Sequence, residues 1–221
     1  MDYRKFRLKY RNTPEFSHVK LLLFWPIFGL FFAFVERVGV SNVYTPIHIP
    51  LDDHIPFCEW FVIPYLFWFV FLIGMLVYTF FFEVPAFRKM MRFVICTYSV
   101  TMAIYILFPN CQNLRPTAFP RDNILTRFMA WFYTFDTNTN VCPSLHVIGA
   151  VASLYAGWKS RRFGTRPWRI VFVVITVLIS LSTVFLKQHS ALDVFAALPL
   201  CALGWWVAEA RIPKKKFAQA R

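Results

Sequence analysis

Residues 60–82 read WFVIPYLFWFVFLIGMLVYTFFF, a run of apolar side chains that contains no charged residue. A helix needs about 20 mostly apolar residues to cross a hydrocarbon layer about 30 Å thick, so this run predicts a membrane-spanning helix. Five more apolar runs occur, at about 19–40, 90–108, 143–158, 168–186 and 190–210. The sequence therefore predicts an all-α, polytopic membrane protein, in which 1–221 form a single domain with a bundle of six transmembrane helices.

The amino-acid composition favours the same fold class. Of the 221 residues, 58% are hydrophobic and only 16% are charged, whereas soluble domains have about 45–50% apolar and about 25% charged residues. The net charge is nevertheless +13, which in a soluble protein would suggest a nucleic-acid partner. Because the basic residues of a membrane protein gather in its loops, we expect lipid headgroups, and no nucleic acid, to face this charge.

The positions of Lys and Arg predict how the chain is oriented. Nineteen of the 24 lie on one side, in the N-terminal segment, two connections and the C-terminal segment. By the positive-inside rule both termini are cytoplasmic, with basic segments at 1–18 and 211–221 on either side of a helical core at 19–210. The first apolar run is long and no cleavage site follows it, so we expect an uncleaved anchor and a multi-pass protein of the plasma membrane.

The shortest apolar run opens with a polar motif, NVCPSLH at 140–146. Pro143 suits the first turn of a helix, which would place Ser144 and His146 at a helix N-terminus. Free N–H groups and the helix dipole at such an end favour an anion, of which phosphate is the obvious candidate. A run this short must also begin at headgroup depth or in a polar cavity.

A second polar motif, KQHSALD at 187–193, joins the last two apolar runs. If the last helix has begun by His189, Asp193 lies four residues further along on the same face. Its carboxylate would accept a hydrogen bond from one imidazole nitrogen and leave the other free as a nucleophile or base. Lys187 would then supply a cation for a phosphoryl group.

The connection at 109–141 is the third polar stretch, and it carries Arg115, Arg121, Arg127 and Asp136. Its middle, MAWFYTF at 129–135, is aromatic enough to lie along the membrane interface. All three polar stretches fall on the extracytoplasmic side of the predicted topology. Ionisable groups at membrane depth are costly, so each of them is a candidate functional residue.

Two other sets of residues have simpler interpretations. The segment HIPLDDH at 48–54 resembles a set of metal ligands, but the prolines in and around it prevent regular helical spacing. We therefore expect a solvated outer loop there and no metal. The five cysteines contain no CxxC pair, which disfavours a zinc site. We expect free thiols, with a Cys111–Cys142 disulfide as the alternative.

Taken in order, the polar motifs resemble those of the type 2 phosphatidic acid phosphatase superfamily, six-span membrane enzymes with the pattern K-x6-R-P, P-S-G-H and S-R-x5-H-x3-D. The family's Gly, Lys and Arg fall here on Leu145, Phe108 and Thr183. The PSLH spelling is more similar to the branch with inositol phosphorylceramide synthase and sphingomyelin synthase, which transfer a phospho-headgroup between lipids. The matching residues are Arg115 and Pro116, then Pro143, Ser144 and His146, then Ser182, His189 and Asp193.

The resemblance implies an integral-membrane lipid phosphatase or phosphotransferase that acts at the extracytoplasmic leaflet without a metal or cofactor. His189, oriented by Asp193, would attack phosphorus to form a phosphohistidine, and His146 would protonate the leaving alcohol. The substrate would be a lipid phosphate or a phospholipid, with a diacylglycerol- or ceramide-type lipid as a candidate acceptor. The implied phosphate-binding residues are Ser144, Arg115 and Lys187, with Gln112 and Arg121 as further candidates.

Several alternatives stay open at this level. Either water or a lipid alcohol can receive the phosphoryl group, which separates hydrolysis from headgroup transfer. Phe108 and Thr183, which stand where the family has cations, are the support for an inactive relative that acts as a scaffold. A transporter would need polar residues along several spans from one face to the other, whereas here they cluster at one side. The sequence does not indicate an oligomeric state.

Overall fold

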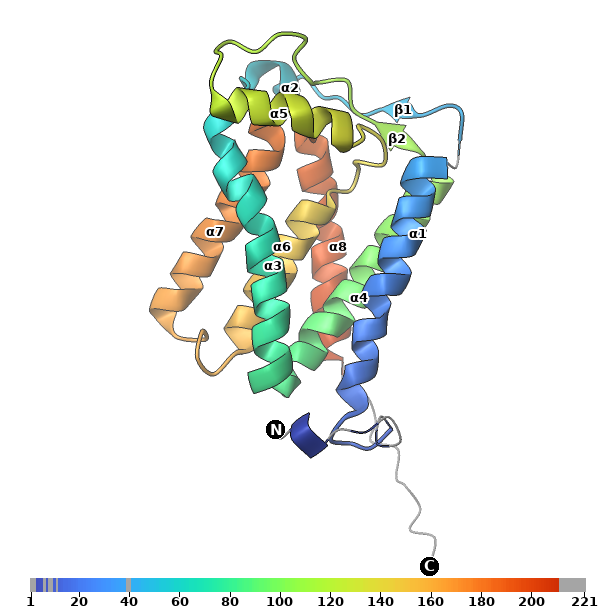
Figure 1. Ribbon diagram of the computed structural model, residues 1–221, viewed down its shortest axis with the longest axis vertical. Coiled ribbons are helices and arrows are strands. Elements are labelled where there is room, and N and C mark those ends of the chain that lie inside the picture. Colours follow the sequence, from blue (N-terminus) through green and yellow to red (C-terminus); the bar gives the residue numbers. More distant parts are fainter. Residues whose placement is uncertain (1–2, 6, 8–9, 11, 39–40, 211–221) are drawn as a thin grey trace, which may run out of the picture.

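The computed structural model describes residues 3–5, 7, 10, 12–38 and 41–210 (Figure 1). The predicted basic tail at 211–221, and part of the predicted basic segment at 1–18, lie outside the described residues. The bundle is formed by α1 (Phe24–Val38), α3 (Val62–Phe82), α4 (Val84–Leu107), α6 (Leu145–Lys159), α7 (Arg166–Phe185) and α8 (Ala191–Glu209).

Shorter elements complete the fold. The helices α2 (Leu51–His54) and α5 (Ile124–Phe135) lie at one end of the bundle (Figure 1). At the same end the two-residue strand β1 (Thr45–Pro46) pairs in parallel with β2 (Asn110–Cys111). The 3-10 turns are η1 (Tyr3–Lys5), η3 (Ser17–Leu23) and η4 (Glu59–Phe61).

Within the described residues, five helical segments are long and apolar enough to cross a membrane: Ser17–Val38, Glu59–Phe82, Val84–Leu107, Arg166–Phe185 and Ala191–Glu209. They coincide with five of the six apolar runs, so the predicted all-α class with membrane-spanning helices is confirmed at that level. Large apolar side chains remain exposed on their outward faces, among them Leu30 on α1 and Val70 on α3. Such surfaces are expected where a helix faces lipid.

The remaining apolar run, at about 143–158, forms α6, which packs against α3, α4, α7 and α8. It has only 15 residues, and most of them are buried. Two glycines allow this close packing, because a Cβ atom on Gly157 would lie 2.4 Å from the Phe172 ring and one on Gly149 would lie 2.7 Å from the Tyr98 hydroxyl. Since protein surrounds α6 on several sides, it does not need the length of a lipid-facing span.

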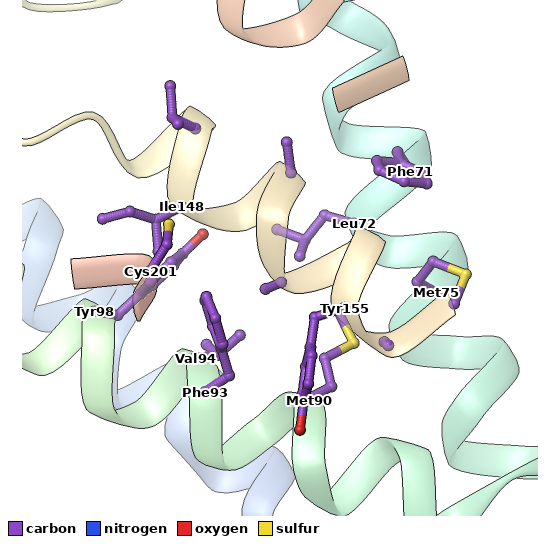
Figure 2. Close-up of a cluster of buried hydrophobic side chains, with 14 of the residues drawn as sticks. Phe71, Leu72, Met75, Met90, Phe93, Val94, Tyr98, Ile148, Tyr155 and Cys201 are labelled. Carbon is purple, nitrogen blue, oxygen red and sulfur yellow. The ribbon is translucent and has the colours of Figure 1, made fainter. Parts of the chain in front are cut away.

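The hydrophobic core lies where α3, α4, α6 and α8 meet (Figure 2). Aromatic rings fill much of this core, and Phe93 of α4 stacks on Tyr155 of α6 with ring centres 5.8 Å apart. The packing therefore fixes α6 relative to three neighbouring helices. The labelled core residues are Phe71, Leu72, Met75, Met90, Phe93, Val94, Tyr98, Ile148, Tyr155 and Cys201.

The starts of α1 and α4 differ most from the predicted ones, by five and six residues. The third apolar run starts as α4 at Val84 and not near 90, because Pro85 suits a first helical turn. The first run forms the 3-10 turn η3 before α1 begins at Phe24. Pro26 then falls in the first turn of α1, where the missing N–H costs least.

The helix α5 lies across the end of the bundle (Figure 1). Asn123 caps it, since its Oδ1 accepts hydrogen bonds from Leu125 N and Thr126 N at 3.0 Å. Trp131 and Phe135 remain exposed on this helix. The aromatic segment predicted to lie along the membrane interface is thus a helix that runs across the bundle end.

The opposite end of the bundle holds η1 and the last turn of α8 (Figure 1). There the Nζ atoms of Lys89 and Lys159 lie 2.7 and 2.5 Å from the carboxylate of Glu209. The described chain therefore enters and leaves the bundle at the end away from α5.

Candidate active site

A cavity of about 310 Å³ lies between the bundle helices close to α5. His146 and His189 both line it, although 43 residues separate them in the sequence. The wall comes from α1, α3, α4, α5, the start of α6 and the segments at 136–141 and 188–189, and Phe, Tyr and Trp side chains make up half of it. Its aromatic lining residues are Trp25, Phe28, Phe32, Tyr65, Trp68, Phe69, Tyr98, Tyr105, Phe132 and Phe135.

His189 is held by Asp193. Its Nδ1 lies 3.0 Å from Asp193 Oδ2, so this nitrogen donates to the carboxylate. The same oxygen accepts a hydrogen bond from Ser190 N at 3.1 Å, and Asp193 is fully buried. Because a carboxylate can only accept from Nδ1, the ring has its lone pair on Nε2 when it is neutral. Nε2 is therefore the nitrogen that can attack a substrate in the cavity.

The route to this contact differs from the predicted one. The helix α8 begins at Ala191, and Ser190 is its N-cap, so His189 precedes the helix. Asp193 reaches back as the acidic partner of a capping box, in which the N3 side chain accepts from the N-cap N–H. The predicted contact between His189 and Asp193 is present, but the condition from which it was derived, a helix that has begun by His189, is not met.

His146 is the second residue of α6, and its ring centre lies 5.6 Å from that of His189. The His146 ring packs against the rings of Tyr65 and Trp68, with ring centres 4.6 Å away in each case. Packing by two bulky rings from α3 restricts the orientation of this imidazole. The two histidines thus face one cavity from different helix N-termini.

A backbone hydrogen bond connects the N-terminus of α6 to that of α8. Ser144 caps α6, with its Oγ 3.5 Å from Val147 N, and its own N–H donates to the Asp193 carbonyl at 3.2 Å. The Tyr105 hydroxyl donates to the Pro143 carbonyl at 2.7 Å. Pro143 therefore precedes the cap and is not in the first turn, because the Ser144 side chain begins the helix one residue later.

Asn110 organises the segment that leads into α6. Its Oδ1 accepts hydrogen bonds from Val141 N at 2.9 Å and Cys142 N at 2.8 Å, and its Nδ2 donates to the carbonyls of Phe108 and Cys142. The side chain is fully buried. Asn110 was not predicted as a site residue, because a lone Asn after an apolar run carries no signal of what it will bind.

Asp52 of α2 holds the N-terminus of α8 through hydrogen bonds to its carboxylate. Its Oδ2 accepts from Ser190 Oγ at 2.6 Å, and its Oδ1 accepts from Ala191 N at 2.7 Å. Asp52 is only 1% exposed, so the expectation of a solvated loop is wrong for this residue. The rest of the segment does face solvent, since His48, Asp53 and His54 are exposed.

We expect Asp52→Ala to lower the free energy of unfolding by about 2–4 kcal/mol, because it leaves buried donors at Ser190 and Ala191 without their acceptor. Denaturant unfolding of the purified protein in detergent measures this change. Asp53→Ala is the matched control, since its carboxylate is exposed and pairs with an exposed His48. Equal stability of the two variants would contradict a role for Asp52 in holding α8.

The structure does not bring the predicted phosphate-binding residues to the wall of the histidine cavity. Among the described residues, those that line it include none of this set: Ser144, Arg115, Lys187, Gln112 and Arg121. Each has another partner at the α5 end of the bundle. Their assignment as phosphate ligands therefore stays a prediction from the motifs alone.

Arg115 binds backbone carbonyl groups and does not face the histidine cavity. Its Nη1 donates to the carbonyls of Tyr133 and Asp136 at 3.0 Å, and its Nη2 donates to that of Thr137 at 2.9 Å. The guanidinium also lies 4.6 Å from the centre of the Tyr133 ring. Burial lowers the pKa of Arg115, and the nearby Asp136 opposes this shift. Arg115 thus ties down the C-terminal end of α5.

The other members of that set are also engaged. Lys187 adopts a left-handed conformation, with φ of 52°, at the turn between α7 and α8. A residue in this conformation commonly ends a helix and reverses the chain. The remaining contacts are Lys187 Nζ to the Asp52 carbonyl at 2.8 Å, Arg121 Nη1 to Glu59 Oε1 at 3.3 Å, and Leu114 N to Gln112 Oε1 at 2.7 Å.

Two carboxylates outside the predicted catalytic and phosphate-binding sets line the cavity, Glu36 of α1 and Asp136 after α5. Asp136 was named only as a member of the third polar stretch, and Glu36 was not singled out. Burial raises the pKa of Asp136, while the nearby Arg115 and His189 act in the opposite direction. The available signal for Glu36 was an acidic residue at the end of an apolar run, where ionisable groups are costly. Its partners could not be predicted, because they lie about 100 residues away in the chain.

All five cysteines are free thiols, which confirms the preferred expectation over a Cys111–Cys142 disulfide. Comparisons of the chain with protein-family models, with curated proteins and with solved structures give no match. The geometry of the histidine cavity and the sequence motifs are therefore what supports a function.

Proposed function

We propose that the chain is an integral-membrane lipid phosphatase or phosphotransferase of the type 2 phosphatidic acid phosphatase superfamily. The observation that carries the proposal is the pairing of His189 with Asp193 beside a second histidine, His146, in one cavity. A buried carboxylate that orients an imidazole, with a further acid–base group within reach, is the arrangement that nucleophilic catalysis requires.

In the proposed reaction His189 Nε2 attacks phosphorus, and a P–N bond forms as the P–O bond to the leaving lipid alcohol breaks. The leaving oxygen takes a proton from His146. The negative charge of the bound phosphate favours the protonated form of this imidazole. Water or a lipid hydroxyl then attacks the phosphohistidine and passes its proton to His146. The P–N bond breaks, and His189 is restored. Asp193 stabilises the positive charge that forms on the His189 ring.

Donors for the phosphoryl oxygens are present without any Lys or Arg. The first N–H groups of α6, at Leu145 and His146, have no acceptor within the helix, and the helix dipole makes this end positive. The indole Nε1–H of Trp68 is buried without a hydrogen-bond partner, and Trp68 lines the same cavity. These groups support transfer of a phosphoryl group even though the family's cations are replaced.

The proposal includes six spans, with α6 as the short one, cytoplasmic termini and an active site on the extracytoplasmic side of the plasma membrane. Its support is the distribution of charge between the two ends of the bundle. Lys89 and Lys159 lie at the end away from α5, and the positive-inside rule assigns basic loops to the cytoplasm. The histidine cavity lies near α5, at the other end.

In the decisive assay, the purified protein is incubated with labelled phosphatidate or with an intact labelled phospholipid. Each substrate is tested with and without diacylglycerol or ceramide as an acceptor. Release of inorganic phosphate from phosphatidate would identify a phosphatase. A new labelled lipid that appears only with an acceptor would identify a phosphotransferase. No turnover of any of these substrates would contradict the proposal and favour an inactive scaffold, or a transporter if labelled solutes cross vesicles that contain the protein.

A further inference from the structure

The charged groups that line the histidine cavity are unusual for a site that binds only phosphate. Apart from the two histidines, they are Glu36 and Asp136, and no Lys or Arg of the described residues lines the cavity. Neither carboxylate forms an ion pair within the described part of the chain. Both carboxylates are half-buried, and Arg115, His189 and Arg37 lie near Asp136 without forming an ion pair with it. A negative charge that is partly withdrawn from water is costly without a paired cation, so a cationic group in this cavity would be favoured.

The partners of these carboxylates are neutral. Glu36 accepts hydrogen bonds from the Thr137 hydroxyl and from Asn140 Nδ2, the latter at 2.7 Å. Asp136 Oδ2 accepts from Gln188 Nε2 at 2.8 Å. Because neutral donors leave the charge in place, the carboxylates stay available to a cation.

Two amide oxygens add to this surplus of acceptors. Asn140 and Gln188 are 4% and 2% exposed and line the cavity, and their amide nitrogens already face the carboxylates. Asn140 Oδ1 and Gln188 Oε1 are buried without a hydrogen-bond partner. Unpaired buried acceptors are uncommon in proteins, and an N–H donor on a ligand would satisfy them.

Aromatic rings surround the same groups. Phe32 lies one helical turn before Glu36 on α1, and Phe135 directly precedes Asp136 at the end of α5; both rings line the cavity. The faces of aromatic rings attract ammonium groups. The Arg37 guanidinium already lies 5.7 Å from the centre of the exposed Phe135 ring, so a cation is held beside this ring within the protein itself. Carboxylates, unpaired amide oxygens and aromatic rings thus favour the same kind of ligand.

We propose that the cavity selects phospholipids whose headgroup carries an ammonium group, with the phosphate at the histidines and the ammonium at Glu36 and Asp136. The proposal rests on the proposed function and names its substrate class. Gln188 donates a hydrogen bond to Asp136, and the next residue, His189, is the proposed nucleophile. The segment at 188–189 thus contacts the group that would bind the ammonium and carries the group that would bind the phosphate. Phosphatidate, which has no cation, would bring further negative charge to two carboxylates.

The first test compares turnover of phosphatidylethanolamine, phosphatidylcholine, phosphatidylglycerol and phosphatidate by the purified full-length protein in mixed micelles. The P–O bond that breaks is the one to diacylglycerol in each case, so diacylglycerol release is the common readout. We expect kcat/KM for an ammonium lipid to exceed that for phosphatidylglycerol and phosphatidate by at least about tenfold. Equal or faster turnover of phosphatidylglycerol or phosphatidate would overturn the proposal.

The second test removes one charge. Glu36→Gln should lower kcat/KM for phosphatidylethanolamine by roughly 30-fold and change that for phosphatidylglycerol by less than about twofold. Asp122→Asn is the control, because Asp122 also lies at the α5 end but is exposed and pairs with Arg127. An equal loss on both lipids would indicate a structural role for Glu36 and contradict headgroup selection. If Glu36→Gln does not fold, Asp136→Asn provides the same comparison.

A binding measurement keeps this proposal separate from the proposed chemistry. The His189→Ala variant cannot form the phosphohistidine, so calorimetry with it reports affinity alone. Phosphoethanolamine should bind at least about tenfold more tightly than glycerol 3-phosphate, which carries a phosphate but no ammonium. If wild type turns over no lipid but this preference holds, the proposed function fails and the headgroup site stands. If the preference is absent, the headgroup site is refuted whatever the activity.

Discussion

His189→Ala is expected to lower turnover of a phospholipid substrate by more than about 10³-fold, because it removes the atom that bonds to phosphorus. The structure shows no other imidazole in contact with Asp193 among the described residues, so no neighbour can take over this role. The measurement is kcat of the purified variant in detergent. A second readout is trapping with ³²P-labelled substrate, in which an acid-labile label on wild type should be absent from the variant.

His48→Ala is the matched control for this experiment. His48 lies at the same end of the protein, but it is exposed and pairs with Asp53 outside the cavity. Its removal should leave kcat unchanged. Size-exclusion profiles of both variants should match wild type. The unfolding temperature of His189→Ala should fall, because Asp193 loses the partner of its buried carboxylate, but unfolding should stay cooperative. Wild-type activity in His189→Ala would refute the phosphohistidine mechanism.

His146→Ala should lower turnover by about 10²–10⁴-fold for substrates that release a lipid alcohol, because the leaving oxygen then departs without a proton. A p-nitrophenyl ester, whose leaving group needs no proton, distinguishes the two histidines. The phosphohistidine should still form from this ester in His146→Ala, whereas in His189→Ala it should not. An equal loss of activity on both substrates in His146→Ala would show that His146 shapes the cavity and does not donate a proton.

His54→Ala serves as the control for His146, because His54 is exposed and its Nδ1 bonds only to the Pro50 carbonyl. It should behave as wild type with both substrates. The ring of His146 packs on Tyr65 and Trp68, so His146→Gln is the second variant if the alanine substitution leaves a gap. Glutamine keeps much of the side-chain volume but cannot act as an acid at neutral pH.

The helices could be predicted because lipid imposes a single rule on each segment. An isolated stretch in hydrocarbon must satisfy its own backbone, so length and apolarity suffice to predict a helix. The start of α8 could not be placed in this way, since it depends on how Ser190 and Asp193 hydrogen-bond locally. The pairing of His189 with Asp193 was nevertheless predictable, because helix spacing brings residues four apart onto one face. In the structure the capping box has a similar effect, since it turns the Asp193 side chain back towards the residues before the helix.

The cavity wall was less predictable than its histidines. The connection at 109–141 has no apolar period, and its path depends on buried hydrogen bonds such as those of Asn110 and Arg115. A basic residue near a phosphate motif suggests a phosphate ligand, yet backbone carbonyls can satisfy the same guanidinium. Glu36 became a site residue only through the folded structure, which places the end of α1 beside α5 and the segment after it.

The hydrogen bond from Ser144 N to the Asp193 carbonyl has a consequence for how the protein tolerates mutation. It joins the backbones that carry the two histidines, so side-chain replacements at 144 or 193 leave the bond itself available. The spacing between His146 and His189 is then set by two helix ends that are hydrogen-bonded to each other. Under the proposed chemistry, sequence changes in the loops at the α5 end would alter which headgroup is accepted without moving the two histidines apart. Substrate range and catalytic activity would then evolve separately.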